Sequence, residues 1–192
     1  MDQFDKNVFI NCPYDKDYES LLRPMVFTIK YLGFVPRLAL ERSDSGESRI
    51  EKLFNLIRES RYSIHDISRM EAGEEKEIYR LNMAFELGID FGCRQYSERG
   101  VHTQKKYLIL EHNEHLYKKA ISDISAFDIK SHNNEPWTMV RIIRNWFVQN
   151  TEIGRTKSGG QIWYHFNDFM SDFNIKMNSD GYNQEDIDDM PI

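Results

Sequence analysis

The sequence predicts an α/β protein with a doubly wound, mostly parallel five-stranded sheet and an additional C-terminal helix. Short apolar runs alternate along the chain with segments whose apolar residues recur at helical spacing. This alternation is typical of right-handed crossover units, which build a parallel sheet covered on both faces. The chain has 192 residues, of which 40% are hydrophobic, and this suits one compact domain.

Five apolar runs are expected to form the strands, over residues 7–12, 34–40, 61–67, 106–111 and 127–131. Pro13 ends the first run because proline cannot donate to a sheet ladder. Helical spacing predicts helices over residues 18–33, 50–57, 82–93, 114–121, 136–149 and 161–175. The helix over 82–93 is apolar on nearly every side, so we expect it to be buried among its neighbours.

The chain divides into three parts. Residues 1–150 are expected to form the α/β domain, and residues 151–177 a C-terminal helical extension reached through the flexible connection TEIGRTKSGG. The aromatic stripe of this last helix either packs on the sheet domain or serves as a docking surface for another subunit. Residues 178–192 are acidic and lack periodicity, so we expect a disordered tail.

Composition excludes several classes of function. The 25 Lys and Arg residues against 31 Asp and Glu residues give a net charge of -6, which opposes binding to a nucleic acid. No run of roughly 18 apolar residues is present to cross a membrane, and the first strand starts too early for a signal peptide. We therefore expect a cytoplasmic protein that binds neither nucleic acid nor membrane.

No metal or cofactor is expected. Cys12 and Cys93 lack zinc-ligand spacing and are interpreted as buried or partly buried thiols. His112 and His115 have no third ligand in view, and His65 inside a strand is interpreted as a satisfied core histidine. The chain also lacks the glycine-rich and serine motifs of P-loop enzymes, dinucleotide-binding folds and serine hydrolases.

Ligands of open parallel sheets bind outside the carboxyl ends of the strands. This rule selects residues 11–14, 42–46, 66–69 and the start of the helix at Asn82. The candidate site residues in these stretches are Asn11, Pro13, Tyr14, Arg42, Ser45, Asp66, Ser68, Asn82 and Glu86.

Glu86 is the most conspicuous candidate, because an ionised carboxylate is costly on an apolar helix. It requires either a raised pKa or a hydrogen-bonding neighbour, and either state is useful in a cleft. Asn82 lies one turn earlier on the same face. The alternative is a structural carboxylate tied to an arginine or to backbone amides. For Asp66 the alternative is a residue that caps the loop after its strand.

Three motifs together resemble the nucleoside 2-deoxyribosyltransferase-like proteins: FINCPY at 9–14, SIHDIS at 63–68 and MAFELG at 83–88. That group shares a flavodoxin-like sheet with the TIR domains and includes small bacterial proteins of antiviral defence. In the transferases a helix start presents a catalytic glutamate to the sugar, and Glu86 matches it, with Ala84 and Gly88 also agreeing. Leu81, Asn82 and Met83 depart from the family's Asp-x-Gly-Thr lead-in.

The resemblance implies chemistry at the anomeric carbon of a ribosyl group attached to a base. Glu86 would stabilise or attack this carbon, and Asn82 would hold a ribose hydroxyl. Asp66 would hold a hydroxyl or orient a water molecule, and Tyr14 would stack on the base. The helix N-terminus after Ser45, together with Arg42 or Arg49, would bind phosphate.

We therefore expect an N-glycosidase that cleaves the base–ribosyl bond of a nucleotide, with NAD the favoured substrate, in bacterial antiviral defence. Glu86 and Asp66 are the expected catalytic residues. One alternative is a non-catalytic nucleotide-sensing or signalling module that uses the same cleft, and another is a nucleoside deoxyribosyltransferase. Besides the nucleotide, the expected partners are further copies of the chain in a homo-oligomer and an activating protein.

Overall fold

The computed structural model describes residues 3–41, 46–69, 81–98 and 100–190. Its centre is one five-stranded sheet with the order β2-β1-β3-β4-β5, in which every neighbouring pair is parallel. This confirms the predicted α/β class. The strands are β1 (Asn7–Asn11), β2 (Val35–Leu38), β3 (Tyr62–Asp66), β4 (Lys106–Glu111) and β5 (Lys130–Ser131).

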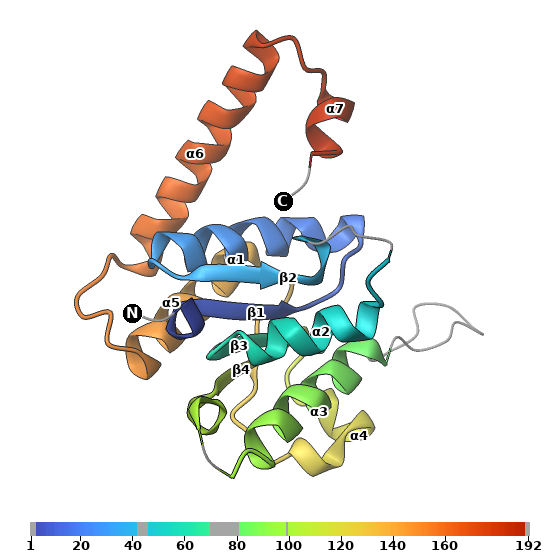
Figure 1. Ribbon diagram of the computed structural model, residues 1–192. Helices are drawn as coiled ribbons and strands as arrows, with labels where there is room; N and C mark the ends of the chain where they lie inside the picture. The colour runs from blue at the N-terminus through green and yellow to red at the C-terminus, as the bar shows by residue number, and fades with distance from the viewer. Residues whose placement is uncertain (1–2, 42–45, 70–80, 99, 191–192) are drawn as a thin grey trace.

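Helices cover both faces of the sheet (Figure 1). The longer helices are α1 (Glu19–Tyr31), α2 (Arg49–Arg58), α3 (Asn82–Gln95), α5 (Pro136–Asn150) and α6 (Gly159–Ser179), and the short ones are α4 (Tyr117–Ala120) and α7 (Gln184–Asp188). Single 3-10 turns occur at Gln3–Asp5, Lys16–Tyr18, Ala39–Glu41, Val101–Gln104 and Ser122–Ile124.

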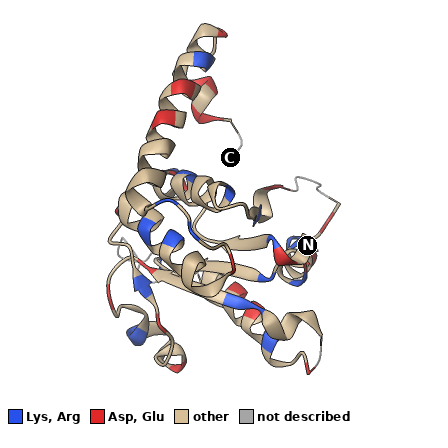
Figure 2. Ribbon diagram, turned by 90° about the vertical axis from the view of Figure 1, so that its left-hand side faces the viewer, with Lys and Arg blue, Asp and Glu red and all other residues tan. Residues whose placement is uncertain are grey.

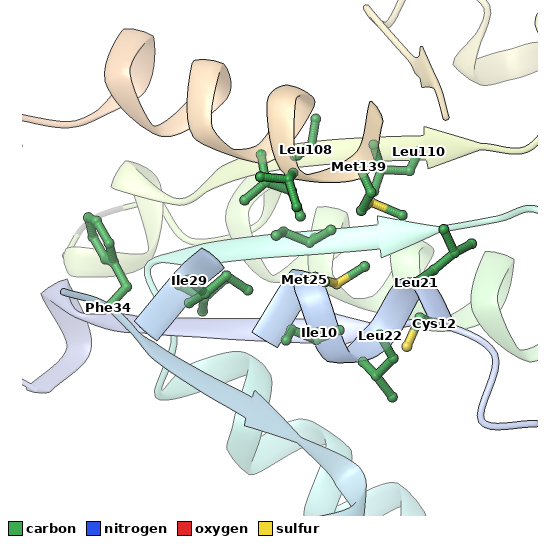
Figure 3. Packing of buried hydrophobic residues seen from close by; sticks show 14 of the residues in the cluster. Ile10, Cys12, Leu21, Leu22, Met25, Ile29, Phe34, Leu108, Leu110 and Met139 are labelled. Atoms are coloured by element: carbon green, nitrogen blue, oxygen red, sulfur yellow. The ribbon is translucent and has the colours of Figure 1, made fainter. Parts of the chain in front are cut away.

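The larger core lies between the sheet and the pair α1 and α5. Alternate residues of each strand point to this face, such as Val8 and Ile10 of β1 and Leu108 and Leu110 of β4. Figure 3 shows these side chains meeting apolar residues of α1 and Met139 of α5. Full burial of each such side chain is worth about 1.5–3 kcal/mol, so this face holds the sheet and its helices together.

The opposite face packs against α2 and α3. Phe9 of β1 contacts a cluster from α2 that includes Leu56, while Ile109 of β4 packs with Met83 and Leu87 of α3. Between these two apolar clusters the strands carry buried polar residues, including Asn11 and His65. The α2–α3 face is therefore where the fold places its polar chemistry.

Local sequence explains where the helices begin and end. Asp15 accepts the backbone N–H of Tyr18 just before α1, and Gly33 follows the helix with a φ of +83°, a conformation that glycine adopts without strain. Ser48 caps α2 by accepting the backbone N–H of Glu51, so this helix starts three residues later than a start after Ser45.

Three elements are clearly shorter than the sequence predicts. The expected helix over residues 114–121 is reduced to Tyr117–Ala120, the second strand, expected over 34–40, to Val35–Leu38, and the fifth strand to Lys130–Ser131. Glu111 is the physical reason for the first difference, because its carboxylate accepts the backbone N–H groups of His115, at 2.7 Å, and Tyr117, at 3.2 Å. The chain therefore folds around this buried carboxylate before the helix begins.

The C-terminal region is longer and more regular than expected. Helix α6 continues to Ser179, and the segment expected to be a disordered tail contains α7, which begins with a capping box formed by Asn183 and Asp186. Ile187 of α7 is buried. Figure 1 shows the far half of α6 standing away from the sheet, with α7 turning back beside it.

Both cysteines are free thiols, with Cys12 buried and Cys93 partly buried. Within the described ranges, no helix combines the length and the apolar character needed to cross a membrane.

Candidate functional site

The candidate site lies at the carboxyl edge of the sheet, beside β1 and β3. The chain leaves β1 toward β2 on one side and returns to β3 on the other, so the strand order reverses between these two strands. Such a reversal separates the loops that follow the two strands and opens a place for a ligand. Helices α2 and α3 both begin at this edge (Figure 1), and the residues expected to bind ligand lie around it.

Glu86 occupies the second turn of α3 and is 8% exposed. Its nearest charged partner is Arg49 at the start of α2, with 3.8 Å between the guanidinium Nη2 and the carboxylate Oε1. This contact is loose, because the Arg49 side chain is 69% exposed. Among the described residues, no group donates a hydrogen bond to Glu86, and its one ion-pair contact there is this loose one.

Burial raises the pKa of Glu86 above its usual value, and the positive charge of Arg49 only partly opposes this. A largely buried carboxylate interacts more strongly than an exposed one with any positive charge that develops beside it, since less water screens it. The raised pKa expected for a carboxylate on an apolar helix is present. Of the alternative, the arginine is present as the loose Arg49 contact at 3.8 Å, while no backbone amide of a described residue binds Glu86.

A series of buried hydrogen bonds holds α3 against the sheet and thereby positions Glu86. The side-chain amide of Asn11 donates to the backbone carbonyl of Met83 at 2.8 Å and lies 3.0 Å from Nδ1 of His65. Nε2 of His65 lies 3.1 Å from Asp90, which is one turn beyond Glu86 on α3. Because Nδ1 accepts from Asn11, Nε2 carries the ring proton and donates it to Asp90.

Asp90 also forms an ion pair with a buried lysine. Its carboxylate lies 3.2 Å from Nζ of Lys105, which donates as well to the carbonyls of Ile57 and Ser60. Burial opposes ionisation of Asp90, but the hydrogen bonds from His65 and Ser63 and the charge of Lys105 outweigh it and lower the pKa. Asp90 is therefore an ionised structural carboxylate. His65 is a satisfied core histidine, as expected.

Asp66, at the end of β3, is fully buried in a second network. It accepts hydrogen bonds from the hydroxyl of Tyr18, from the hydroxyl and backbone N–H of Ser68, and from Nε2 of His132 at 3.0 Å. Nδ1 of His132 accepts the backbone N–H of Asn134 at 3.0 Å, which leaves the ring proton on Nε2.

Burial opposes ionisation of Asp66, but the hydrogen bonds from His132, Ser68 and Tyr18 outweigh it and lower the pKa of this carboxyl. Asp66 thus stays ionised, with its oxygens occupied by protein donors and none of its surface exposed. In this arrangement it positions the loop after β3 and the start of α1, as the capping alternative expected.

The loop after β1 lies at the same edge of the sheet. Pro13 is buried, and the hydroxyl of the half-buried Tyr14 donates to the carbonyl of Ile10 at 3.0 Å. Burial raises the pKa of Tyr14 well above its usual value, and the nearby charge of Glu86 adds to this effect. Tyr14 therefore stays protonated, with its hydroxyl held by the carbonyl of Ile10 and near enough to Glu86 to feel its charge.

Cys12 lies beside the same charges but offers no nucleophile. Burial, followed by the charges of Asp66 and Glu86, raises its pKa well above the usual value. Its thiol therefore remains protonated, and a reactive thiolate does not form there.

The remaining candidates differ in their placement. Asn82 is exposed one turn before Glu86, Asn11 is buried, and Ser68 is half-buried with its hydroxyl engaged by Asp66. Arg42 and Ser45 lie outside the described residues. The structure therefore brings Asn82, Tyr14 and Arg49 near Glu86. Asn11 and Asp66 are buried and hold the surrounding elements in place.

Several residues that build the site are not evident from sequence. Asp90 is four positions after Glu86, so helical spacing alone places it on the same side of α3. Lys105 and His132 carry no such signal, because they approach from a turn before β4 and from the end of β5. Among the described residues, no group of three or more histidine, cysteine or acidic side chains is arranged to hold a metal ion.

No family model matches the chain, and a search of curated proteins found no match.

Proposed function

We propose that the protein cleaves the base–ribosyl bond of a nucleotide, with NAD as the preferred substrate and Glu86 as the catalytic carboxylate. The observation that carries this proposal is the state of Glu86, which is desolvated, has a raised pKa and receives no hydrogen bond from a described residue. Buried carboxylates are normally hydrogen-bonded, and an exception at the carboxyl edge of a parallel sheet is a functional candidate.

The chemistry suits a cationic transition state. When the bond between C1′ and the base nitrogen breaks, its electron pair leaves with the base and positive charge spreads over C1′ and the ring oxygen. An ionised Glu86 stabilises this charge or bonds to C1′. Water then supplies a hydroxyl to C1′ and releases one proton.

The state of Asp66 favours NAD over a neutral nucleoside. Nicotinamide leaves a cationic nucleotide as a neutral base and needs no proton, whereas most other bases leave readily only when an acid protonates them. Asp66 is held ionised by Tyr18, Ser68 and His132, so it is a poor proton donor. In the proposed mechanism Asp66 is a positioning residue. The resemblance to the deoxyribosyltransferase-like and TIR proteins supports the same chemistry.

Neighbouring residues have assigned roles in the proposed complex. Arg49, which is largely exposed at the start of α2, would bind a phosphate together with the helix N-terminus. Asn82 would contact a ribose hydroxyl, and the ring of Tyr14 would contact the base.

The test is release of nicotinamide from NAD, followed by chromatography, for the wild type and for Glu86→Gln. We expect the substitution to lower the rate by at least about 100-fold, as loss of a single catalytic group does. Glu98→Gln is the matched control, because Glu98 is an exposed glutamate just after α3. Equal rates for the wild type and Glu86→Gln would refute the proposal.

A second candidate function is nucleotide sensing without cleavage. The observation that favours it is the burial of Asp66, because this carboxylate, the expected second catalytic group, has no exposed surface. Calorimetric titration with NAD, combined with recovery of the ligand, separates the two functions. Tight binding with intact NAD recovered after long incubation supports the sensor.

A further inference from the structure

Helix α6 carries an apolar stripe that extends beyond the body of the protein. Ile162 and Phe166 are buried, and the ring of Phe166 lies 5.4 Å from that of Phe27 on α1. One turn further, Phe169 is 52% exposed, and Phe173 stacks on it with 6.2 Å between ring centroids. The first half of the stripe is thus covered by α1 and α5, whereas in the second half Phe169 is exposed and Phe173 is half-buried.

The second half of the stripe borders a groove of about 750 Å³. One wall is the α1 side with Phe27 and Tyr31, the floor reaches Pro36 of the edge strand β2, and the other wall contains Phe169 and Phe173 of α6. Apolar grooves of this kind, open to solvent on a folded domain, mark interaction sites.

Charge is distributed unequally along the arm formed by α6 and α7. Seven carboxylates and a single lysine lie between Asp168 and Asp189, on the far part of α6 and on α7. Figure 2 shows these acidic residues on the part of the arm that stands away from the sheet. The base of the arm carries the opposite charge, since four basic residues and one glutamate lie between Arg141 and Lys157.

The basic residues lie next to the start of α6 and beside the groove. Arg155 and Lys157 are exposed in the connection before α6, and Arg141 of α5 packs against Gly159 in the first turn of α6. Arg23 and Lys30 of α1 add positive charge at the groove, where Glu41 is an opposing carboxylate. The arm therefore has an acidic tip and a basic base.

We propose that the groove receives the α6 arm of a second copy of this chain, in an antiparallel, twofold-symmetric dimer. In this arrangement the acidic tip of each arm meets the basic base of the other, and the second halves of the two apolar stripes cover one another. A parallel pairing would place tip against tip and base against base, where like charges repel. The self-complementary charge pattern selects a second copy as the occupant, because twofold interfaces pair each surface with itself.

The dimensions of α6 agree with this pairing. Its 21 residues span about 31 Å at 1.5 Å per residue. If the two helices cross near Met170, the level of Asp180 on one copy coincides with that of Gly160 on the other. Asp180 then lies close to Arg155 and Lys157 of the second copy. Two arms and two grooves have to bury roughly 1,200–2,000 Å² in total for a stable interface.

The experiment is sedimentation velocity over a concentration series with the full chain. A tip variant carries Asp172→Lys and Asp180→Lys, and a base variant carries Arg155→Glu and Lys157→Glu. We expect the wild type to dimerise and each variant alone to associate at least about tenfold more weakly, because like charges then face each other. Mixing the two variants restores a dimer, since each altered tip meets an oppositely charged base.

Restoration in the mixture is the result that separates this interface from any other, and a misfolded variant does not produce it. Asp123→Lys is the control, because Asp123 is exposed just after α4, on the opposite side of the molecule from the arm. We expect this variant to dimerise as the wild type does. A wild type that stays monomeric at all concentrations, variants that dimerise unchanged, or a mixture that stays monomeric would each overturn the proposal.

Discussion

Asp66 and Glu86 are carboxylates at the same edge of one sheet, and their surroundings are opposite. Asp66 is fully buried and accepts hydrogen bonds from Tyr18, Ser68 and His132, which lower its pKa. Glu86 is nearly as buried and has a raised pKa, and its one ion-pair partner in the described part of the chain is Arg49, in a loose contact.

The comparison teaches that burial alone does not reveal what a carboxylate does. A buried carboxylate that is held ionised by donors and by a positive charge stabilises the fold, and Asp90, with His65, Ser63 and Lys105 around it, is a second example. A buried carboxylate that lacks donors destabilises the fold when it is ionised. Its free lone pairs remain available to a ligand. Stability measurements on matched variants therefore distinguish the two kinds of carboxylate independently of any activity.

The largest effect is expected for Asp90→Ala. Loss of this carboxylate leaves Lys105 buried without its counter-charge, so the free energy of unfolding falls by about 3–5 kcal/mol. Urea denaturation measures the change. The double variant Asp90→Leu with Lys105→Met removes both charges and recovers part of the loss. If the single and double variants are equally unstable, the ion pair is not the cause.

Asp66→Asn is expected to lower the free energy of unfolding by about 2 kcal/mol, because hydrogen bonds to an ionised acceptor are lost. The pKa of Asp66 is lowered in the folded state, so its contribution is present above the ordinary pKa of aspartate. It disappears as the pH falls through the lowered value. Denaturation curves at several pH values should show the difference between wild type and variant shrinking in acid.

Glu86→Gln is expected to have the opposite sign. The pKa of Glu86 is raised on folding, so folding favours the protonated form and loses stability as the pH rises from the ordinary glutamate pKa through the raised one. At pH 7 the glutamine variant gains about 1 kcal/mol, and the gain vanishes in acid. Thermal unfolding of the wild type and the variant at pH 7 and in acid measures this difference in stability. A variant less stable than the wild type at pH 7 would show that Glu86 is a structural carboxylate.

Arg49→Ala should have the smallest effect on stability, within about 0.5 kcal/mol, because the Arg49 side chain is largely exposed. Its effect on Glu86 has a definite direction, since removal of the positive charge raises the pKa of Glu86 further. The acid limb of the pH–rate profile for nicotinamide release should therefore move to higher pH. An unchanged acid limb would mean that Arg49 does not influence the reactive carboxylate.

Much of the fold follows from local sequence. The spacing of apolar residues identifies the strands and the long helices, and Pro13 and Gly33 lie where β1 and α1 are followed by turns. Glu86 is conspicuous because a carboxylate on an apolar helix has an energetic cost that the sequence alone reveals. These features depend on neighbours within one or two turns of the chain.

The environment of each carboxylate was decided by tertiary structure. His132, which binds Asp66, lies 66 positions later in the chain, and Lys105, which pairs with Asp90, lies in the turn before β4. Such partners leave no periodic pattern, because a hydrogen bond depends on where two distant elements meet. Glu111 and Ile187 show the same limit, since one shortens an expected helix and the other holds α7 in a segment expected to be disordered. Local sequence is enough to identify Glu86 as an anomaly, whereas the packing of distant elements satisfies Asp66 and gives Glu86 no hydrogen-bond donor among the described residues.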